Sequence, residues 1–249
     1  MSAAQKVTIH ILDDPEQVAH AAAERFVGAA NAAIETGGRF SVALSGGSTP
    51  KHVYELLASD DYRNRIAWSN IHIFFGDERC VPANHPESNY RMALESLISH
   101  VPIPIENVHP MQGFGDPEVN ARAYEQELRN FFQKVAWPRI DLVFLGLGDD
   151  GHTASLFPGT SALKENKEWV VANWVEKFNT FRLTLTVPVI NHAIEIKFLV
   201  TGSGKAKALA AVLQGPGKPE ELPAQLIQPV DGSLEWLVDK EAAANLDAH

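Results

Sequence analysis

The stretch from residue 141 to residue 159 limits what this chain can fold into more than any other. It begins with a short apolar run, Leu142–Leu145, which has the length of a strand and no polar side chain to face solvent. A strand of that kind is buried on both faces, as in a parallel sheet covered by helices. Three glycines, two carboxylates and a histidine follow within seven residues. That composition indicates an active-site loop at the end of a strand.

Strand-like and helix-like segments alternate from the beginning of the chain. Residues 7–12 form a predicted strand, and Asp14 and Pro15 then supply the capping residue and the first residue of a helix. That helix ends at Gly37-Gly38, and Phe40–Leu44 is the second strand. The alternation predicts an α/β fold in which a doubly wound, mostly parallel sheet carries helices on both faces, as in Rossmann-like proteins.

The same alternation continues without an internal repeat or a low-complexity linker. We therefore expect a single domain over residues 1–249, which is long enough for a well-buried core. Residues 222–238 suggest a short strand pair and a closing helix. The other predicted elements are strands at residues 71–75, 169–174, 182–187 and 196–200, and helices at residues 90–99, 117–133 and 206–213.

Charge and composition exclude several classes of partner. The formal net charge is −10 and no run of Lys or Arg occurs, so a nucleic-acid surface is not expected. A single cysteine, Cys80, excludes an intrachain disulfide and suggests a reducing compartment. The N-terminal residues have no apolar signal core, and no apolar run approaches membrane-spanning length. We therefore expect a soluble cytoplasmic protein; the oligomeric state is left open.

The loop after the second strand has the composition of a phosphate cradle. Gly46 and Gly47 let the backbone turn with its N–H groups inward, and Ser45, Ser48 and Thr49 add hydroxyl donors. A helix follows, and its N-terminus adds a partial positive charge. The spacing is not that of a Walker A loop. A plain strand-to-helix turn with Ser/Thr capping is the alternative explanation, but the glycines and hydroxyls together favour anion binding.

Asp77 and Arg79 stand at the end of the third strand. Ligands of open parallel sheets bind beyond the carboxyl ends of the strands. The arginine can hold a carboxylate or phosphate oxygen, and the aspartate can orient it or bind a hydroxyl. An Asp–Arg ion pair that steadies the loop is an equally good explanation.

His152 lies in the glycine-rich loop after the central apolar run, with Asp150 two residues before it. The glycines match the G-x-G-x-x-G pattern of dinucleotide sites, but Asp149 and Asp150 would face the pyrophosphate and Pro158 leaves little room for the required helix. His152 fits a general base better, and a structural or exposed histidine is the alternative. Metal binding is a third option, but the histidines show no metal-site spacing, so we expect no metal.

Two further cations follow strands later in the chain. Lys205 comes after a strand end and a glycine pair, where it is well placed to meet a phosphate. Ala206 follows it where a P-loop has Ser or Thr, so the nucleotide interpretation fails. Arg182 starts a predicted strand and reaches the same pocket or is a solvated edge charge.

Taken together, these loops resemble one family, the 6-phosphogluconolactonases. The resemblance spans residues 40–205 in order and spacing, and the segment from Leu222 with Trp236 and Asp239 is also similar. The matching motifs are Ser45-Gly-Gly-Ser-Thr-Pro50, Gly76-Asp-Glu-Arg79 with Ser88-Asn89-Tyr90, Leu145-Gly-Leu-Gly-Asp-Asp-Gly-His-Thr-Ala-Ser-Leu-Phe-Pro-Gly159, and Gly202-x-Gly-Lys205.

The resemblance implies hydrolysis of 6-phospho-D-glucono-1,5-lactone to 6-phosphogluconate in the pentose phosphate pathway, without metal or nucleotide cofactor. It implies that His152 is the general base and that Asp150 or a nearby backbone carbonyl fixes its tautomer. It also implies that Arg79, with Asp77 beside it, or backbone N–H groups of the loops stabilise the oxyanion that develops at the carbonyl. The residues that it implies for the 6-phosphate are Ser45, Gly46, Gly47, Ser48, Thr49 and Lys205, with Arg182 as a further candidate.

Two other functions remain to be weighed. The related glucosamine-6-phosphate deaminases carry a glutamate five residues after the corresponding histidine, where this chain has Phe157. Ring opening and proton transfer at C1 and C2 need that additional acid/base group, so its absence favours the lactonase. A non-catalytic sugar-phosphate sensor would need a DNA-binding segment, and no basic helix-turn-helix precedes the first strand in this sequence.

Overall fold

A computed structural model describes residues 6–247 of the chain. Short 3₁₀ turns connect many of its elements. The strands are β1 (Lys6–Leu12), β2 (Phe40–Leu44), β3 (Ile71–Phe75), β4 (Asp77–Arg79), β5 (Leu142–Leu145), β6 (Val170–Val175), β7 (Thr180–Leu185), β8 (Glu195–Val200) and β9 (Ser233–Asp239). The helices are α1 (Pro15–Gly37), α2 (Ser48–Ala58), α3 (Asp60–Arg63), α4 (Asn89–Ser96), α5 (Pro117–Phe132), α6 (Val187–Asn191) and α7 (Ala206–Gln214).

Six parallel strands form the central sheet, in the order β1-β9-β8-β5-β2-β3. The chain moves outward from β2 to β3, and from β5 through β8 to β9 in the opposite direction. The strand order therefore reverses between β2 and β5, which are neighbours. In doubly wound sheets, ligands bind in the crevice beyond the carboxyl ends of the strands at such a reversal. The fold thus points to the loops that follow β2 and β5.

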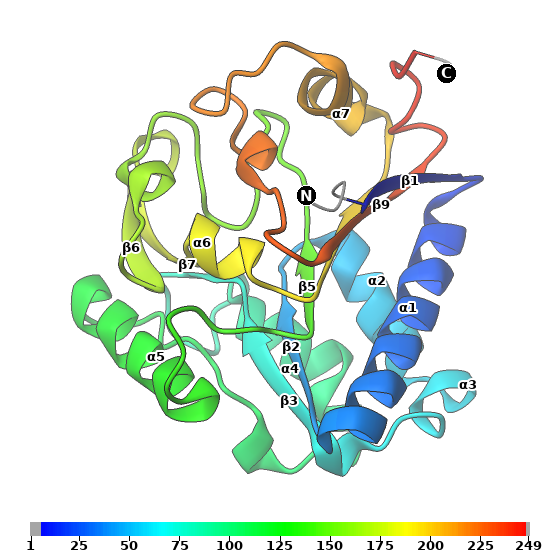
Figure 1. Cartoon of the computed structure of the whole chain (residues 1–249), viewed down its shortest axis with the longest axis vertical. Coiled ribbons are helices and arrows are strands. Elements are labelled where there is room, and N and C mark those ends of the chain that lie inside the picture. Colours follow the sequence, from blue (N-terminus) through cyan, green and yellow to red (C-terminus); the bar gives the residue numbers. More distant parts are fainter. Residues whose placement is uncertain (1–5, 248–249) are drawn as a thin grey trace.

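Helices cover both faces of this sheet, which confirms the predicted architecture (Figure 1). On one face, Arg25 of α1 binds the Glu235 carboxylate of β9 with two nitrogens. The next residue, Trp236, points to the other face and lines a hollow with Val212 and Leu213 of α7. All four residues of β5 are buried, as its composition predicts for a strand between two helical layers.

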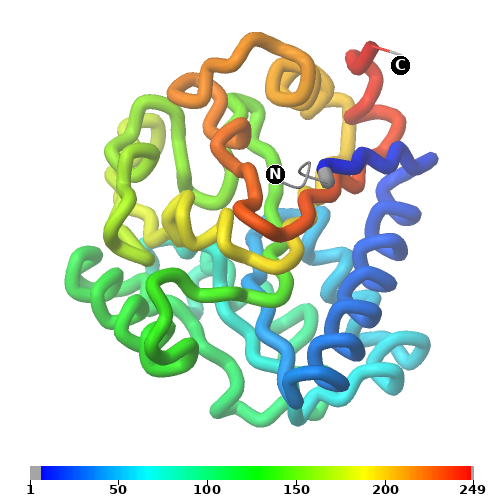
Figure 2. Tube along the Cα trace, viewed as in Figure 1, coloured from blue at the N-terminus to red at the C-terminus, as the bar shows by residue number. Residues whose placement is uncertain are grey.

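Local sequence signals fix the ends of α1 as predicted. Asp14 accepts a hydrogen bond from the Gln17 backbone N–H at 2.9 Å, and Pro15 is the first helical residue. Gly38 ends the helix with φ at 75°, a backbone conformation that glycine adopts without strain. The helix then returns the chain from the edge strand β1 to β2. Figure 2 shows that β1 and β9, from opposite ends of the sequence, lie side by side.

A second, antiparallel sheet in the order β4-β7-β6 was not predicted. It begins one residue after β3, because Gly76 separates β3 from β4. The segments at 169–174 and 182–187 are strands as predicted, but β7 ends at Leu185 and Val187 already belongs to α6. Helix α5 packs on β6 and β7 of this smaller sheet. The second sheet therefore carries Asp77 and Arg79 away from the plane of the first.

The prediction for the C-terminal part is wrong. Residues 234–238 do not form a closing helix but lie in β9, which pairs in parallel with both β1 and β8. A short stretch that is apolar except for Glu235 fits a strand as well as a helix, and here pairing with β1 and β8 decides in favour of the strand. The predicted strand pair is also absent from the described residues: a single 3₁₀ turn, Pro223–Leu226, precedes β9.

Candidate active site

A cavity of about 270 Å³ opens where the strand order reverses. Its walls come from the segments that follow β2, β3, β5 and β8. The lining residues are Ser45, Gly46, Gly47, Asp77, Arg79, Asn89, Gly146, Leu147, Gly148, His152, Ala154 and Lys205. Segments far apart in the sequence therefore meet at one sheet edge, as the motif positions predicted.

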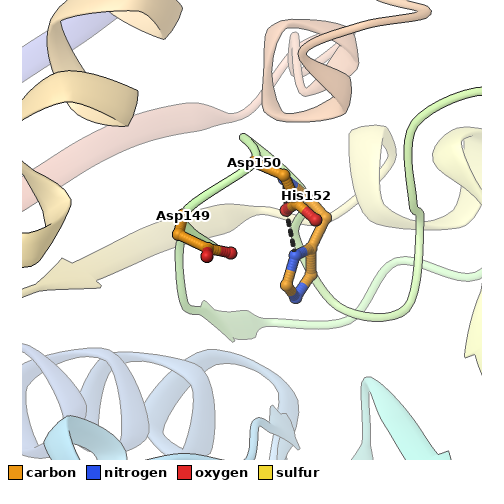
Figure 3. Close-up of side chains that lie close together, drawn as sticks. All are labelled: Asp149, Asp150 and His152. Atoms are coloured by element: carbon orange, nitrogen blue, oxygen red, sulfur yellow. Dashed lines mark hydrogen bonds and ion pairs between the residues drawn. The ribbon is translucent and has the colours of Figure 1, made fainter. Parts of the chain in front are cut away.

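His152 and Asp150 lie side by side in the loop after β5 (Figure 3). The His152 Nδ1 is 2.5 Å from Asp150 Oδ1. The same carboxylate oxygen accepts a hydrogen bond from the His152 backbone N–H at 3.2 Å. An ionised carboxylate has only acceptor sites, so the imidazole proton belongs on Nδ1 and Nε2 keeps its lone pair. This is the tautomer that a general base needs.

Lys177 binds the second carboxylate oxygen of Asp150, and the sequence did not predict this contact. It lies in the 3₁₀ turn Glu176–Phe178 between β6 and β7, and its Nζ donates to Asp150 Oδ2 at 2.9 Å and to Asp149 Oδ1 at 3.2 Å. Burial raises the pKa of the Asp150 carboxyl, but the hydrogen bonds from His152 and Lys177 outweigh burial and hold the pKa well below its usual range. Asp150 is therefore a fixed negative charge beside the histidine.

The face of the His152 imidazole is also packed against other residues. Phe157 stacks on it with ring centroids 4.0 Å apart and an interplanar angle of 25°. Phe157 in turn meets Phe178 edge-to-face. Gly148 also packs closely, since a Cβ on it would lie 2.0 Å from His152 Nδ1. The glycine at position 148 thus makes room for the histidine.

Asp77 lines the cavity, and hydrogen bonds from Ser155 and Asn89 hold it in place. Its Oδ2 accepts from the Ser155 hydroxyl at 2.6 Å, and its backbone carbonyl accepts from Asn89 Nδ2 at 2.9 Å. Arg79 donates from Nη1 to the Glu87 carbonyl at 2.6 Å. Among the described residues Asp77 and Arg79 form no ion pair, so the simple loop salt bridge does not account for them.

Arg182 stands opposite Arg79 in the β4–β7 pairing. Burial, together with the Arg79 guanidinium, lowers the pKa of Arg182. Its guanidinium lies over the Phe178 ring, 5.4 Å from the centroid, and Arg182 does not line the cavity. A role for Arg182 in phosphate binding stays a prediction.

The predicted phosphate loop borders a second, smaller hollow of about 160 Å³. It shares Gly46, Gly47 and Lys205 with the main cavity and adds Ser48 and Thr49 at the start of α2. Lys205 forms no ion pair with any residue between 6 and 247. Tyr54 braces the loop, because its hydroxyl donates to the Ser45 carbonyl at 2.9 Å and lies 3.0 Å from the Ser45 backbone nitrogen, which donates to it. An unpaired ammonium and a helix N-terminus therefore meet at one end of the cavity.

One group of side chains has the spacing of metal ligands. Ligand atoms of Asp149, Asp150 and His152 lie within 4.8 Å of one another. However, the ammonium of Lys177 already binds both carboxylates. The positive charge of Lys177 would repel a metal ion bound to the same two carboxylates. The three residues therefore fit a histidine oriented by a carboxylate better than a metal centre.

Asn89 and Lys177 are two residues of the site to which the sequence assigned no role. Asn89 belongs to a matching motif, but its side chain is 3% exposed and its position in the wall follows only from the packing of α4 on β4. Lys177 lies in a hairpin turn, and no pattern in the neighbouring sequence predicts its contact with residues 149 and 150. Contacts of this kind arise from tertiary structure and leave no local pattern.

Comparison with known proteins identifies the family. A profile of "Glucosamine-6-phosphate isomerases/6-phosphogluconolactonase" matches residues 13–236. A 6-phosphogluconolactonase of Synechocystis sp. is 46% identical over 217 residues, covering 86% of this chain and 88% of that protein. The chain belongs to the 6-phosphogluconolactonase family. A second relative of this name, from Nostoc sp., is 40% identical and covers 97% of this chain and 99% of its own length. The resemblance noted in the motifs is thereby confirmed.

Solved structures of the family share the fold. The 6-phosphogluconolactonase from Trypanosoma brucei is 30% identical, with a TM-score of 0.86 over 98% of this chain and all of that one. A monomeric glucosamine-6-phosphate deaminase at 22% identity has a TM-score of 0.79, which shows only that deaminases have the same fold. No helix within residues 6–247 has the length and apolar character to cross a membrane.

Proposed function

We propose that this protein hydrolyses 6-phospho-D-glucono-1,5-lactone to 6-phosphogluconate. The observation that carries the proposal is the arrangement of the cavity. A histidine oriented by a carboxylate lies on one wall, and an unpaired lysine beside a helix N-terminus lies at the other end. A sugar lactone with a phosphate on C6 has a reactive carbonyl and an anion that match these two ends.

In the proposed reaction, His152 Nε2 removes a proton from water while the water oxygen forms a bond to lactone C1. Asp150 stabilises the imidazolium that results. The C1–ring oxygen bond then breaks, and the imidazolium returns its proton to the departing ring oxygen. The products are the open-chain acid and the neutral histidine, so no metal and no cofactor takes part.

The carbonyl oxygen becomes negative in the tetrahedral intermediate and needs donors that are already in place. Arg79 lines the cavity and is the cationic candidate, together with the backbone N–H of Gly146; the Gly148 N–H already donates to the His152 carbonyl at 2.8 Å. Asp77 lies beside Arg79 and orients the groups around it. Such a donor typically contributes about 3 kcal/mol to stabilisation of the transition state.

The phosphate would bind between Lys205 and the loop of Ser45, Gly46, Gly47, Ser48 and Thr49. Anchoring this remote group positions the carbonyl against His152, and binding energy used in this way lowers the barrier. Thr49 is held in place, since its hydroxyl is 2.7 Å from that of Thr201.

Phe157 argues against a deaminase. Its ring stacks on His152 at the position where the deaminases carry a glutamate. An aromatic ring cannot exchange a proton, so the second acid/base group required at C1 and C2 is absent from that position.

His152→Ala tests the proposal. We expect kcat for fresh 6-phosphogluconolactone to fall by about 10²- to 10⁴-fold, the usual contribution of general acid–base catalysis. Binding of 6-phosphogluconate should change little, because the phosphate end is intact. The matched control is His100→Ala, an exposed histidine whose ring nitrogen Nε2 is 2.9 Å from the Glu95 carbonyl oxygen and which does not line the cavity.

Three outcomes are separable in one assay, with the spontaneous opening of the lactone subtracted. Acid release from the lactone supports the lactonase. Ammonia release from glucosamine 6-phosphate would identify a deaminase, and binding without turnover would identify a sensor. Turnover that survives His152→Ala nearly unchanged would show that another group is the base.

A further inference from the structure

Asn89 lies in the cavity wall but has no part in the proposed reaction. It is the first residue of α4 and is 3% exposed. Its Nδ2 donates to the Asp77 carbonyl at 2.9 Å and lies 3.3 Å from the Asp77 carboxylate oxygen Oδ1. Both neighbours are acceptors, so the amide nitrogen must be on the Asp77 side. The orientation of the amide is therefore fixed by chemistry.

With the nitrogen fixed, the amide oxygen of Asn89 points toward the loop after β2. A Cβ on Gly46 would lie 2.0 Å from Asn89 Oδ1. The oxygen thus stands against the bare Cα of Gly46, where both residues line the cavity. No group among residues 6–247 donates a hydrogen bond to it. Asn89 Oδ1 is therefore a fixed acceptor in the cavity wall that a hydrogen-bond donor of a ligand can reach.

The charge around this oxygen decides what kind of group can meet it. A phosphate has acceptor oxygens only and would be repelled by Asn89 Oδ1 and by the Asp77 carboxylate. A hydroxyl, in contrast, can donate. Lys205, Ser48 and Thr49 line the smaller hollow assigned to the phosphate, whereas Asp77 and Asn89 do not line it and place their acceptor oxygens along the main cavity. These acceptor oxygens fit the part of a sugar that carries hydroxyl groups.

We propose that Asn89 is a specificity-determining residue whose Oδ1 accepts a hydrogen bond from a ring hydroxyl of the lactone. The inference rests on the proposed function, because it places the lactone between His152 and Lys205. Asp77 and Ser155 are positioning residues: the Ser155 hydroxyl holds the Asp77 carboxylate at 2.6 Å, and Asp77 holds the amide. A substrate without the matching hydroxyl leaves a buried acceptor unpaired, which the site penalises.

The close contact with Asn89 Oδ1 gives a second reason for a glycine at position 46. The glycine was expected to turn the backbone around a phosphate. Its missing side chain also provides the space that Asn89 Oδ1 occupies. Any side chain at position 46 would push the amide away from its alignment on Asp77.

The test removes the amide and the hydroxyl separately and together. Wild type and Asn89→Ala are assayed with 6-phosphogluconolactone and with its 2-deoxy, 3-deoxy and 4-deoxy counterparts. For wild type, we expect one deoxy compound to lose about 10-fold or more in kcat/KM, as one lost hydrogen bond of about 1.4 kcal/mol implies. In Asn89→Ala the parent lactone should fall to that level, and loss of the same hydroxyl should then change kcat/KM by less than about 2-fold.

Two further variants protect the test against a folding defect. Gly46→Ala retains the Asn89 side chain but displaces its amide oxygen, and should also abolish the preference for that hydroxyl. Asn107→Ala is the matched control, because Asn107 is a buried asparagine whose amide donates to the Ser69 carbonyl, away from the cavity. It should keep the full preference.

The outcomes distinguish the two proposals. If each deoxy lactone loses as much in Asn89→Ala and Gly46→Ala as in wild type, the role of Asn89 is wrong and the lactonase stands. If wild type opens none of the four lactones faster than water does, the proposed function itself fails.

Discussion

At the scale of single residues, the proposed reaction makes Asp150 the group that determines whether His152 can act as a base. Replacement by Asn keeps the size of the side chain but allows its amide nitrogen to face Nδ1. The imidazole would then place its proton on Nε2, the atom that must accept one from water. We expect Asp150→Asn to lower kcat by about 10- to 100-fold, because loss of a partner that orients a functional histidine has effects of this size.

KM for the lactone should change little in Asp150→Asn, since the phosphate end is untouched. Glu176→Gln serves as the control, because it changes a carboxylate in the same hairpin turn as Lys177 without touching His152. A large rise in KM with unchanged kcat would contradict the role given to Asp150.

Lys205 has the opposite kinetic signature. It borders both hollows and has no ion-pair partner within the described part of the chain, so its charge is available to a ligand. We expect Lys205→Ala to raise KM by about 10-fold or more, as loss of one charge-assisted hydrogen bond of 1.5–3 kcal/mol implies. Lys207→Ala, two residues along at the start of α7, should leave KM unchanged. Steady-state kinetics on the parent lactone decide between the two outcomes.

At the scale of elements, the corner between β4 and α4 depends on one buried carboxylate. Glu78 is 1% exposed and accepts hydrogen bonds from the backbone N–H groups of Arg79, Asn89 and Tyr90 and from the Ser88 hydroxyl. Burial raises the pKa of this carboxyl, while the donors act in the other direction. All four partners are donors, so Glu78 is matched to the start of the helix as a carboxylate.

Glu78→Gln replaces one acceptor oxygen with an amide that must face a donor. We expect the free energy of unfolding to fall by about 2–3 kcal/mol, the cost of disrupting hydrogen bonds to a buried charged group. KM should rise as well, because Asn89 begins the helix that Glu78 holds. Denaturant unfolding measures the first effect, and Glu95→Gln, an exposed position on the same helix, is the control. A free energy of unfolding equal to that of wild type would contradict this role for Glu78.

Some elements of the fold can be predicted from local sequence signals and others cannot. Strand β2 and the start of α1 follow from local signals, and they lie where these signals predict. Strand β9 does not, because the short stretch Leu234–Val238, apolar except for Glu235, suits either a helix or a strand until its neighbours are known. Strands β6 and β7 of the antiparallel sheet were predicted, but strand β4 and the pairing β4-β7-β6 were not, because the contact between β4 and β7 forms between segments about 100 residues apart. His152 and Asp150 are visible in a dense polar loop, whereas Lys177 is brought to them by the β6–β7 hairpin.

At the scale of the whole molecule, stability should depend on pH through a histidine that the reaction does not use. His72 of β3 lies 3.3 Å from His109, whose other ring nitrogen contacts Glu127 of α5. Burial, together with the neighbouring His109 and Arg39, lowers the pKa of His72 to about 4. The folded protein therefore keeps His72 neutral at a pH where the unfolded chain protonates it.

The sign of the effect follows from proton binding. Between pH 6.5 and 4 the unfolded state binds more protons at His72, so stability falls as the pH is lowered through this range. The slope contributed by one group is at most about 1.4 kcal/mol per pH unit. His72→Gln should flatten the dependence of unfolding free energy on pH, while His100→Gln should not. Equal slopes for wild type and His72→Gln would contradict this explanation.

The contact between Gly46 and Asn89 also constrains the order in which mutations can accumulate. The two positions are far apart in the sequence but share one small volume, so a larger residue at 46 is harmful while Asn89 remains. Once residue 89 has become smaller, the same change at 46 should be tolerated. A lineage that alters its sugar preference would therefore change position 89 first and position 46 second, and libraries that vary either site alone would miss the viable pairs.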